Sequence, residues 1–154
     1  MWFIKKDGLM DIETEEKKKL YKVLEKKQLC SVMNNTKWRQ LKEAVLTTLP
    51  FVPPLQIKMV LEDTPNPQNF ENDNDDYGSG DWMDGVPRLL IEWIRDRPGR
   101  LGSMGLIIPP KVIDISKEFL EILNKFKIPY KIDNNTIYIY GYIRDTGSLI
   151  KGDS

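Results

Sequence analysis

"DISKEFLEILNKFKIPYKIDNNTIYIYGYI", residues 114–143, is the stretch of sequence that decides the fold class. Its first half, 114–127, has apolar residues at helical spacing and predicts a helix capped by Asp114 or Ser116. Its second half predicts a hairpin, because two strand-like runs flank residues 133–135, whose Asn residues tolerate a positive φ. A helix that leads into antiparallel strands favours an α+β fold.

The last predicted strand, 136–143, has an aliphatic face and an aromatic face, since strand side chains alternate. The sequence leaves open whether the aromatic face is covered by a helix or partly open to water. Three exposed tyrosines in a row would form an adhesive surface. The aliphatic residues are Ile137, Ile139 and Ile143, and the aromatic residues are Tyr138, Tyr140 and Tyr142.

Alternation predicts two further strands upstream, over 55–62 and 88–95. The second should be central in its sheet, because both of its faces carry apolar residues. Residues 96–105, which follow it, are expected to form a turn or loop. The two faces of the central strand are Leu89, Ile91 and Trp93 on one side and Leu90, Glu92 and Ile94 on the other.

Two helices are predicted before these strands. Residues 11–29 form a highly charged helix with a thin apolar stripe, which we expect to be solvated and weakly docked. The next helix starts at an N-cap, Asn35 or Thr36, and its apolar residues are expected to be buried. These buried residues are Trp38, Leu41 and Val45.

The economical architecture for these elements is α+β, with an antiparallel sheet of about four strands and helices packed on one face. We expect three parts along the chain: a charged helical extension over 1–32, a single domain over 33–145 and a polar tail over 146–154.

The stretch "ENDNDDYGSGDWMDG", residues 71–85, is the strongest candidate for a functional site. Between Glu62 and Asp84 the chain has eight acidic residues and no Lys or Arg. Acidic residues attract a basic partner at long range, and aromatic residues supply contact energy. The candidate partner-binding residues are Asp73, Asp75, Asp76, Tyr77, Asp81, Trp82 and Asp84.

The same stretch can be compared with a calcium-binding loop that begins at Asp73. Positions 1, 3, 6 and 9 of such a loop match, but Tyr77 stands at position 5 and the short Asp84 at position 12. Calcium binding therefore remains an alternative, and we expect no metal and no cofactor.

The composition argues against common enzyme and membrane classes. The chain has no His, which removes the commonest general base, and its one cysteine, Cys30, fits a reducing compartment. The net charge of zero does not favour nucleic acid, and no apolar run is long enough to span a membrane. We expect a cytoplasmic protein that is not an enzyme.

Three motifs stand out in the domain expected over 33–145: "MNNTKW" at 33–38, "IEWIRDRP" at 91–98 and "IPYKIDNNTIYIYGY" at 128–142. Through them, the region from about 33 to 143 resembles a family of small bacterial proteins of unknown function. The resemblance implies no activity and no catalytic residue. In size and style such proteins are similar to the immunity proteins that accompany bacterial toxins.

The leading hypothesis is therefore a non-enzymatic binding protein, most specifically an immunity protein or antitoxin that blocks a basic toxin surface with the acidic stretch. A calcium-responsive module using the same residues is one alternative. A nucleic-acid-associated protein using the Lys-rich N-terminal helix with Arg95, Arg97 and Arg100 is the other. The identity of the partner and the oligomeric state remain open.

Overall fold

The computed structural model describes residues 2–4, 10–12, 14–68, 70, 82–83, 85–102 and 111–150. Within these ranges, the backbone alone is described for 2–4, 10–12, 99–102 and 111–113.

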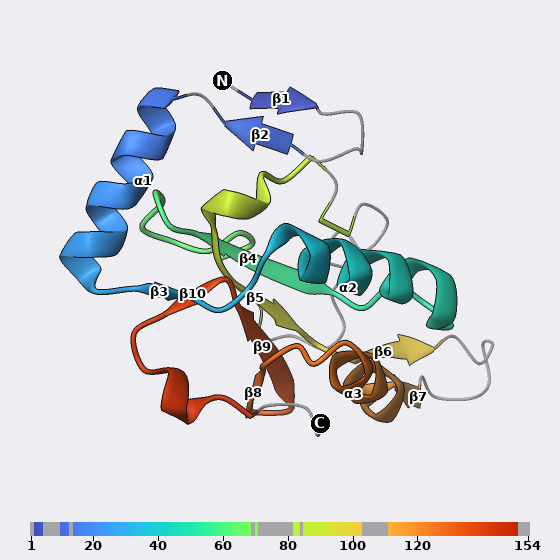
Figure 1. The fold of residues 1–154 in the computed structure, drawn as a ribbon. Coiled ribbons are helices and arrows are strands. Elements are labelled where there is room, and N and C mark those ends of the chain that lie inside the picture. The colour runs from blue at the N-terminus through green and yellow to red at the C-terminus, as the bar shows by residue number, and fades with distance from the viewer. Residues whose placement is uncertain are drawn as a thin grey trace.

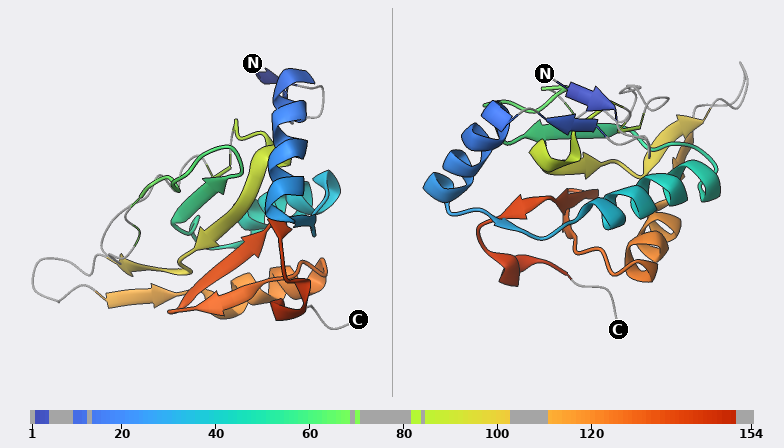
Figure 2. Two further views of the ribbon diagram at one scale, coloured as in Figure 1. Left: turned by 90° about the vertical axis from the view of Figure 1, so that its left-hand side faces the viewer. Right: turned by 45° about the horizontal axis from the view of Figure 1, so that its top comes forward.

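The described part of the chain has an α+β fold, as predicted. Its main sheet has four antiparallel strands in the order β4-β5-β9-β8, so that β5 is central (Figure 1). Helices α2 and α3 cover one face of this sheet, and α1 lies at its side (Figure 2). The helices are α1 (Thr14–Lys27), α2 (Asn35–Thr48) and α3 (Ser116–Lys125), and the strands are β4 (Leu55–Met59), β5 (Ile91–Asp96), β9 (Thr136–Tyr140) and β8 (Lys131–Asp133).

Shorter elements form two-stranded antiparallel ribbons around this sheet. One strand of these ribbons, β6, covers residues 99–102, so the prediction of a turn or loop over 96–105 is wrong for this part. The ribbons pair β1 (Trp2–Ile4) with β2 (Met10–Ile12), β3 (Cys30–Ser31) with β10 (Tyr142–Ile143), and β6 (Gly99–Gly102) with β7 (Lys111–Asp114). Two 3-10 turns, η2 (Arg88–Leu90) and η3 (Thr146–Ser148), complete the described elements.

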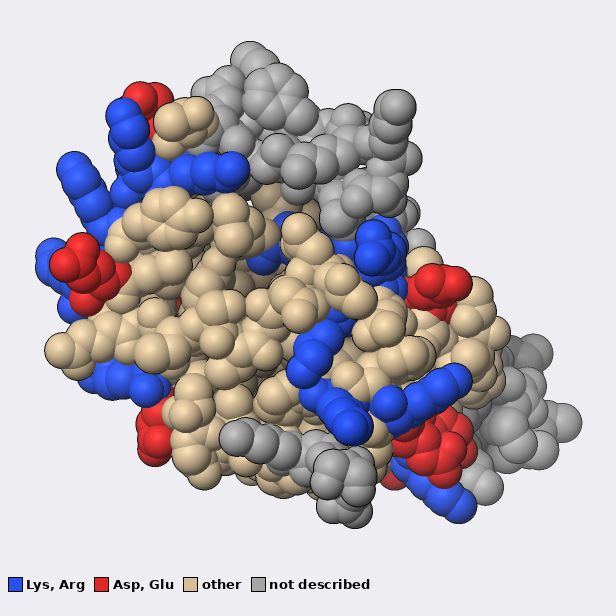
Figure 3. Space-filling view, in the orientation of Figure 1, with Lys and Arg blue, Asp and Glu red and all other residues tan. Residues whose placement is uncertain are grey.

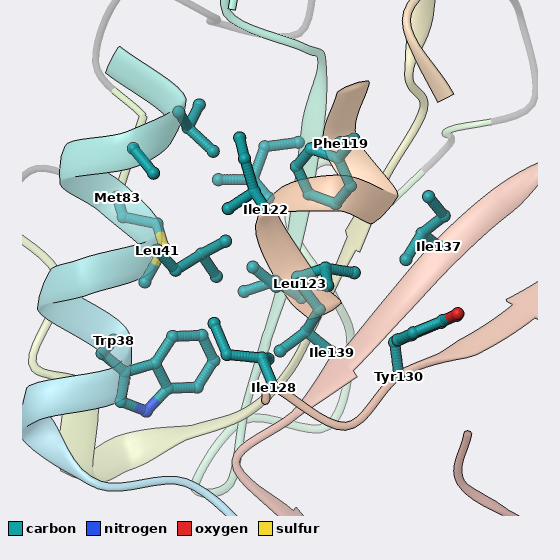
Figure 4. Close-up of a cluster of buried hydrophobic side chains, with 14 of the residues drawn as sticks. Trp38, Leu41, Met83, Phe119, Ile122, Leu123, Ile128, Tyr130, Ile137 and Ile139 are labelled. Carbon is teal, nitrogen blue, oxygen red and sulfur yellow. The ribbon is translucent and has the colours of Figure 1, made fainter. Parts of the chain in front are cut away.

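The main core fills the space between the two helices and the sheet (Figure 4). The predicted burial of Trp38, Leu41 and Val45 on α2 is confirmed. Helix α3 contributes a matching apolar face, and the aliphatic side of β9 lies beneath it. Each fully buried side chain of this size contributes about 1.5–3 kcal/mol through removal of apolar surface from water. The α3 and β9 residues are Phe119, Ile122, Leu123, Ile137 and Ile139.

Local hydrogen bonds explain where the helices begin. Asn34 has an extended backbone, and its side chain accepts a hydrogen bond from the Lys37 N–H at 2.8 Å. Asn34 is therefore the N-cap of α2, and the prediction of Asn35 or Thr36 is wrong. The N-cap of α3 is Ile115, which makes no side-chain cap hydrogen bond, so the prediction of Asp114 or Ser116 as the cap is wrong. The Asp114 carboxylate still accepts a hydrogen bond from the Ser116 N–H at 2.8 Å.

The predicted hairpin is confirmed as β8–β9. Its two turn residues, Asn134 and Asn135, have φ values of 49° and 60°. Positive φ at both positions is typical of the two-residue turn whose twist matches that of the flanking strands.

An irregularity in β5 changes which of its side chains share a face. Trp93 pairs with Lys58 and Ile91 pairs with Met59, so the register shifts and Glu92 is extra. Ile91 and Ile94 consequently both lie in the helix-covered core, and the prediction that Ile91 shares a face with Trp93 is wrong. Alternation of apolar and polar residues in the sequence does not predict a bulge of this kind.

A second break, at Gly141, ends the tyrosine face of β9. A Cβ at this position would lie 2.2 Å from the Ile91 carbonyl oxygen, so only glycine fits without a backbone shift. In this close approach, the Gly141 N–H donates a hydrogen bond to the Glu92 carbonyl oxygen at 2.8 Å. Beyond the break, Tyr142 is buried, and the prediction that it shares a face with Tyr138 and Tyr140 is wrong.

Helix α1 packs on a second, smaller apolar cluster through Leu20, which is fully buried. Leu20 contacts residues of the main domain there, including Tyr142, whose hydroxyl donates to the Leu89 carbonyl at 2.6 Å. The domain boundary at residue 32 stays a prediction. Among the described helices, none combines the length and the apolar character that crossing a membrane requires.

Candidate functional site

The acidic stretch is held at both ends by buried aromatic side chains. Phe70 and Trp82 are each 1% exposed, and residues 71–81 join them in sequence. Both anchors lie against the end of β5, where residues 95–97 contact them as described below. We call Phe70, Trp82 and residues 95–97 the stem. A stem of this kind brings the two ends of the intervening stretch together at the end of β5.

At the first anchor, two arginine side chains lie against the ring of Phe70. The guanidinium carbon of Arg97 is 5.0 Å from the ring centroid, and that of Arg95 is 5.7 Å away. Arg97 Nη2 also donates to the Phe70 carbonyl oxygen. Cation–π contacts that are shielded from water contribute about 2 kcal/mol or more each, so this end is held by more than apolar burial.

Arg95 continues the contacts toward the hairpin. Its Nε donates to Thr136 Oγ1 at 2.9 Å, and Thr136 Oγ1 donates to the Asp133 carbonyl at 2.5 Å. The guanidinium also lies 5.3 Å from the ring centroid of Tyr138. Arg95 is only 7% exposed, so its charge is part of the interior of this sheet face.

At the second anchor, Trp82 points into the main core and faces Asp96, which is 0% exposed. Burial raises the pKa of the Asp96 carboxyl well above its ordinary value, and the indole N–H of Trp82 opposes part of that rise. The two groups do not reach full hydrogen-bond geometry. A buried carboxyl favours its neutral form, because the interior solvates a charge poorly.

The chain that leads to Phe70 is tied to β4. Gln56 Nε2 donates to the Pro67 carbonyl at 2.7 Å, and the backbones of Ile57 and Asn66 exchange two hydrogen bonds. The acidic stretch therefore departs from a segment that is itself fixed on the sheet.

The remaining sheet face opposite the helices carries half-buried aromatic residues. The rings of Trp93 and Tyr138 meet edge to face at 5.2 Å, and those of Tyr138 and Tyr140 stack at 5.9 Å. Beside them, Lys58 and Glu92 form an ion pair at 3.1 Å. Burial, followed by the nearby Tyr138, raises the pKa of Tyr140. This face is thus neither fully covered nor fully open, which the sequence did not decide.

The structure places one of the seven candidate partner-binding residues. Trp82 lies in the core, so its indole anchors the stretch and offers no surface to a partner. The other six lie outside the described residues, as does most of the calcium-loop register, and they stay predictions. They are Asp73, Asp75, Asp76, Tyr77, Asp81 and Asp84.

The structure does not bring the cations of the nucleic-acid alternative, the Lys residues of α1 and Arg95, onto one surface. Helix α1 carries both Lys and Glu side chains, which project from it as blue and red groups in Figure 3. Lys18 and Glu15 form one such exposed pair at 3.6 Å. Since Arg95 is buried beneath Phe70 and Tyr138, it does not extend that surface.

A cavity of about 250 Å³ lies at the N-terminus of α2. Two motifs separated by a hundred residues meet there, since 33–38 and 141–142 both contribute to its wall. The cavity is smaller than the usual cofactor site. We therefore interpret the motif residues that line it as residues that pack around Trp38 and Gly141. It is lined by Ser31, Met33, Asn34, Asn35, Trp38, Arg88, Leu89, Gly141 and Tyr142.

Sequence reasoning missed Asp96 as part of the site. Asp96 is two residues after Ile94, so both side chains point to the same face of β5. This spacing is the signal that a carboxyl lies on the core face of a central strand. Buried ionisable groups of this kind are common near functional sites.

Comparison with known proteins places the chain in a family. No curated protein and no solved structure matches it. One family model matches residues 20–146 and therefore covers most of the chain, including the second half of α1 and all of the main sheet. The chain belongs to this family, which is described as a family of unknown function (DUF6678).

Proposed function

We propose that the protein is a non-enzymatic binding protein that presents its acidic stretch to a basic surface of a protein partner. The observation that carries this proposal is the stem: Phe70 and Trp82 fix both ends of the stretch on residues 95–97, at the end of β5. The exposed contacts would come from the six candidate residues between and beside these anchors.

The stem serves binding in two physical ways. Anchored ends lower the conformational entropy that a stretch of chain loses when it docks, so more of the contact energy appears as affinity. A concentration of carboxylates without intervening cations attracts a basic partner from a distance and raises the rate of encounter.

The specific form of this function that we propose is occlusion, as an immunity protein or antitoxin would exert it. A toxin that acts on an anionic substrate has a basic active surface, and an acidic stretch competes for that surface directly. The proposal does not require catalytic residues in this chain.

The test is capture of the partner from the native host with tagged protein. The wild type is compared with a variant that carries Asp73→Asn, Asp75→Asn, Asp76→Asn, Asp81→Asn and Asp84→Asn. We expect the wild type to retain a basic protein that the variant loses, because the substitutions remove charge and preserve size.

A matched control carries neutral substitutions at exposed acidic residues elsewhere, Glu15→Gln, Glu25→Gln and Glu43→Gln. The control should retain the same partner as the wild type. Equal capture by all three proteins, or loss from the control alone, would show that the acidic stretch is not the binding site.

A further inference from the structure

The cavity at the N-terminus of α2 has hydrogen-bond donors in its wall. Its volume is about 250 Å³, and a water molecule occupies about 30 Å³ in the liquid, so a small hydrated ion fits inside. Packing around Trp38 and Gly141 explains the apolar part of the wall, but it does not explain the donors. Among the described residues of the wall, Arg88 carries the only charge, and no carboxylate is present.

Arg88 brings a positive charge into the interior at this cavity. It begins the 3-10 turn η2 and is only 7% exposed. A guanidinium has several N–H donors in a planar fork, so contacts of Arg88 with the surrounding protein are compatible with a further contact to a ligand. The fork matches the geometry of carboxylate and phosphate oxygens.

The N-terminus of α2 supplies backbone donors beside Arg88. The first N–H groups of a helix have no acceptor within the helix, and they carry a partial positive charge. The Asn34 side chain accepts from the Lys37 N–H at 2.8 Å, and the Asn34 carbonyl accepts from the Trp38 backbone N–H at 3.1 Å. Within the described part of the chain, the N–H groups of Asn35 and Thr36 are left without an acceptor. Such groups commonly bind anions.

The indole N–H of Trp38 is an independent donor at the same cavity. Trp38 is 2% exposed, and its indole N–H has no acceptor among the described residues. An ideal Cβ on Gly141 would lie 3.4 Å from Trp38 Cζ2, so this edge of the ring faces Gly141 in the cavity wall. Nε1 is bonded to the same ring carbon as Cζ2, and Figure 4 shows the nitrogen on the side away from the aliphatic cluster. A buried indole N–H usually has a partner, so this donor is available to a ligand.

We propose that this cavity binds a phosphate group, either as the free ion or as the end of a phosphate monoester. Three kinds of donor meet there: a guanidinium, helix N-terminal N–H groups and an indole N–H. A carboxylate offers fewer oxygens than phosphate and would leave part of this donor set unused. The hydroxyls of Ser31 and Tyr142 donate to the Met33 and Leu89 carbonyls at 3.0 and 2.6 Å, so they stabilise the wall. This inference is independent of the acidic stretch.

The test is a titration of the full chain with inorganic phosphate, followed by proton–nitrogen correlation NMR at constant pH and ionic strength. The indole signal of Trp38 and the backbone signals of Asn35 and Thr36 should shift with the same dissociation constant, whereas the indole signal of Trp82 in the stem should not move. Acetate should bind more weakly than phosphate. Tighter binding of phosphoserine than of inorganic phosphate would identify a monoester as the ligand, and the reverse order would identify the free ion.

A variant with a carboxylate in the cavity wall tests the role of charge. Asn35→Asp is at an exposed position in the first turn of α2, where a negative charge stabilises a helix, so the variant should fold. It should bind phosphate at least about tenfold more weakly than the wild type, because like charges repel. Gln68→Glu makes the same amide-to-acid change at an exposed position outside the cavity wall and should bind like the wild type. Circular dichroism checks the fold of both variants.

Three results would each overturn the proposal. The first is a wild type whose Trp38 and Asn35 signals do not respond to phosphate. The second is acetate that binds more tightly than phosphate. The third is a folded Asn35→Asp protein whose affinity equals that of the wild type or that of Gln68→Glu.

Discussion

The two faces of the main sheet are stabilised in different ways. On the face that α2 and α3 cover, aliphatic and aromatic side chains such as Leu123 and Ile139 are fully buried in one cluster. On the opposite face, Arg95 is buried through ring and hydrogen-bond contacts with Phe70, Tyr138 and Thr136. Apolar burial determines the fold on the first face, and specific polar contacts position a segment of chain on the second.

Asp96 is an exception to the apolar character of the helix-covered face. It lies on the helix-covered side, yet it holds an ionisable group at 0% exposure beside Trp82. A carboxyl in this place opposes stability, so we interpret it as part of the stem that anchors the acidic stretch.

The largest effect is expected from the helix-covered face. Leu123→Ala should lower the free energy of unfolding by about 2–5 kcal/mol, because it removes buried methyl groups and leaves a cavity. Urea unfolding measures the change. Leu46→Ala, at an exposed position of α2, is the matched control and should change stability by less than about 1 kcal/mol. A similar loss in both variants would contradict the assignment of this core.

The next effect is a dependence on pH that originates at Asp96. Because its pKa is raised in the folded protein, the unfolded chain releases this proton first, near the ordinary value of 3.8. Its contribution to stability is present below that pH and is lost as the pH rises toward the folded pKa. The loss amounts to about 1.4 kcal/mol for each unit by which the pKa is raised.

Asp96→Asn removes this dependence, since an amide does not ionise. The free energy of unfolding of this variant should therefore increase relative to that of the wild type as the pH rises above about 4. Chemical unfolding of both proteins across this range is the measurement. The exposed Asp63→Asn serves as the control, and parallel curves for wild type and Asp96→Asn would refute a raised pKa.

A smaller effect is expected from the stem contact between Phe70 and Arg95. In a double-mutant cycle, Phe70→Leu and Arg95→Met should show a coupling energy of about 0.5–2 kcal/mol. The cycle cancels the separate loss of the Arg95 hydrogen bond to Thr136. Additive effects of the two substitutions would mean that the ring contact does not hold the acidic stretch.

The smallest effect belongs to the ion pair at the rim of the second face. Glu92→Gln should cost less than about 1 kcal/mol, because Lys58 and Glu92 are still reached by water, and the cost should shrink at high salt. Thermal unfolding at two salt concentrations measures both quantities. A salt-independent loss above about 2 kcal/mol would place this pair among the buried contacts.

Local patterns in the sequence predicted much of the fold. The spacing in 114–127 and the Asn residues of the turn are local signals, and they located α3 and the β8–β9 hairpin. The bulge at Glu92 and the break at Gly141 were missed, because both depend on how close two distant strands approach.

The site was less predictable than the fold for the same reason. The composition of the acidic stretch is visible in the sequence, and Trp82 was singled out there. Its burial against Asp96 joins residues from different elements, and no spacing rule relates the two positions. The role of Arg95 changed likewise, from a surface cation to a buried support for Phe70.

The salt dependence of partner binding tests the central claim most directly. With the partner captured from the native host, the dissociation constant is measured at increasing salt for the wild type and for the variant with five Asp→Asn substitutions. The account predicts that wild-type binding weakens steeply with salt and that the variant binds weakly with a flatter dependence. Equal affinity and equal salt dependence in the two proteins would contradict it.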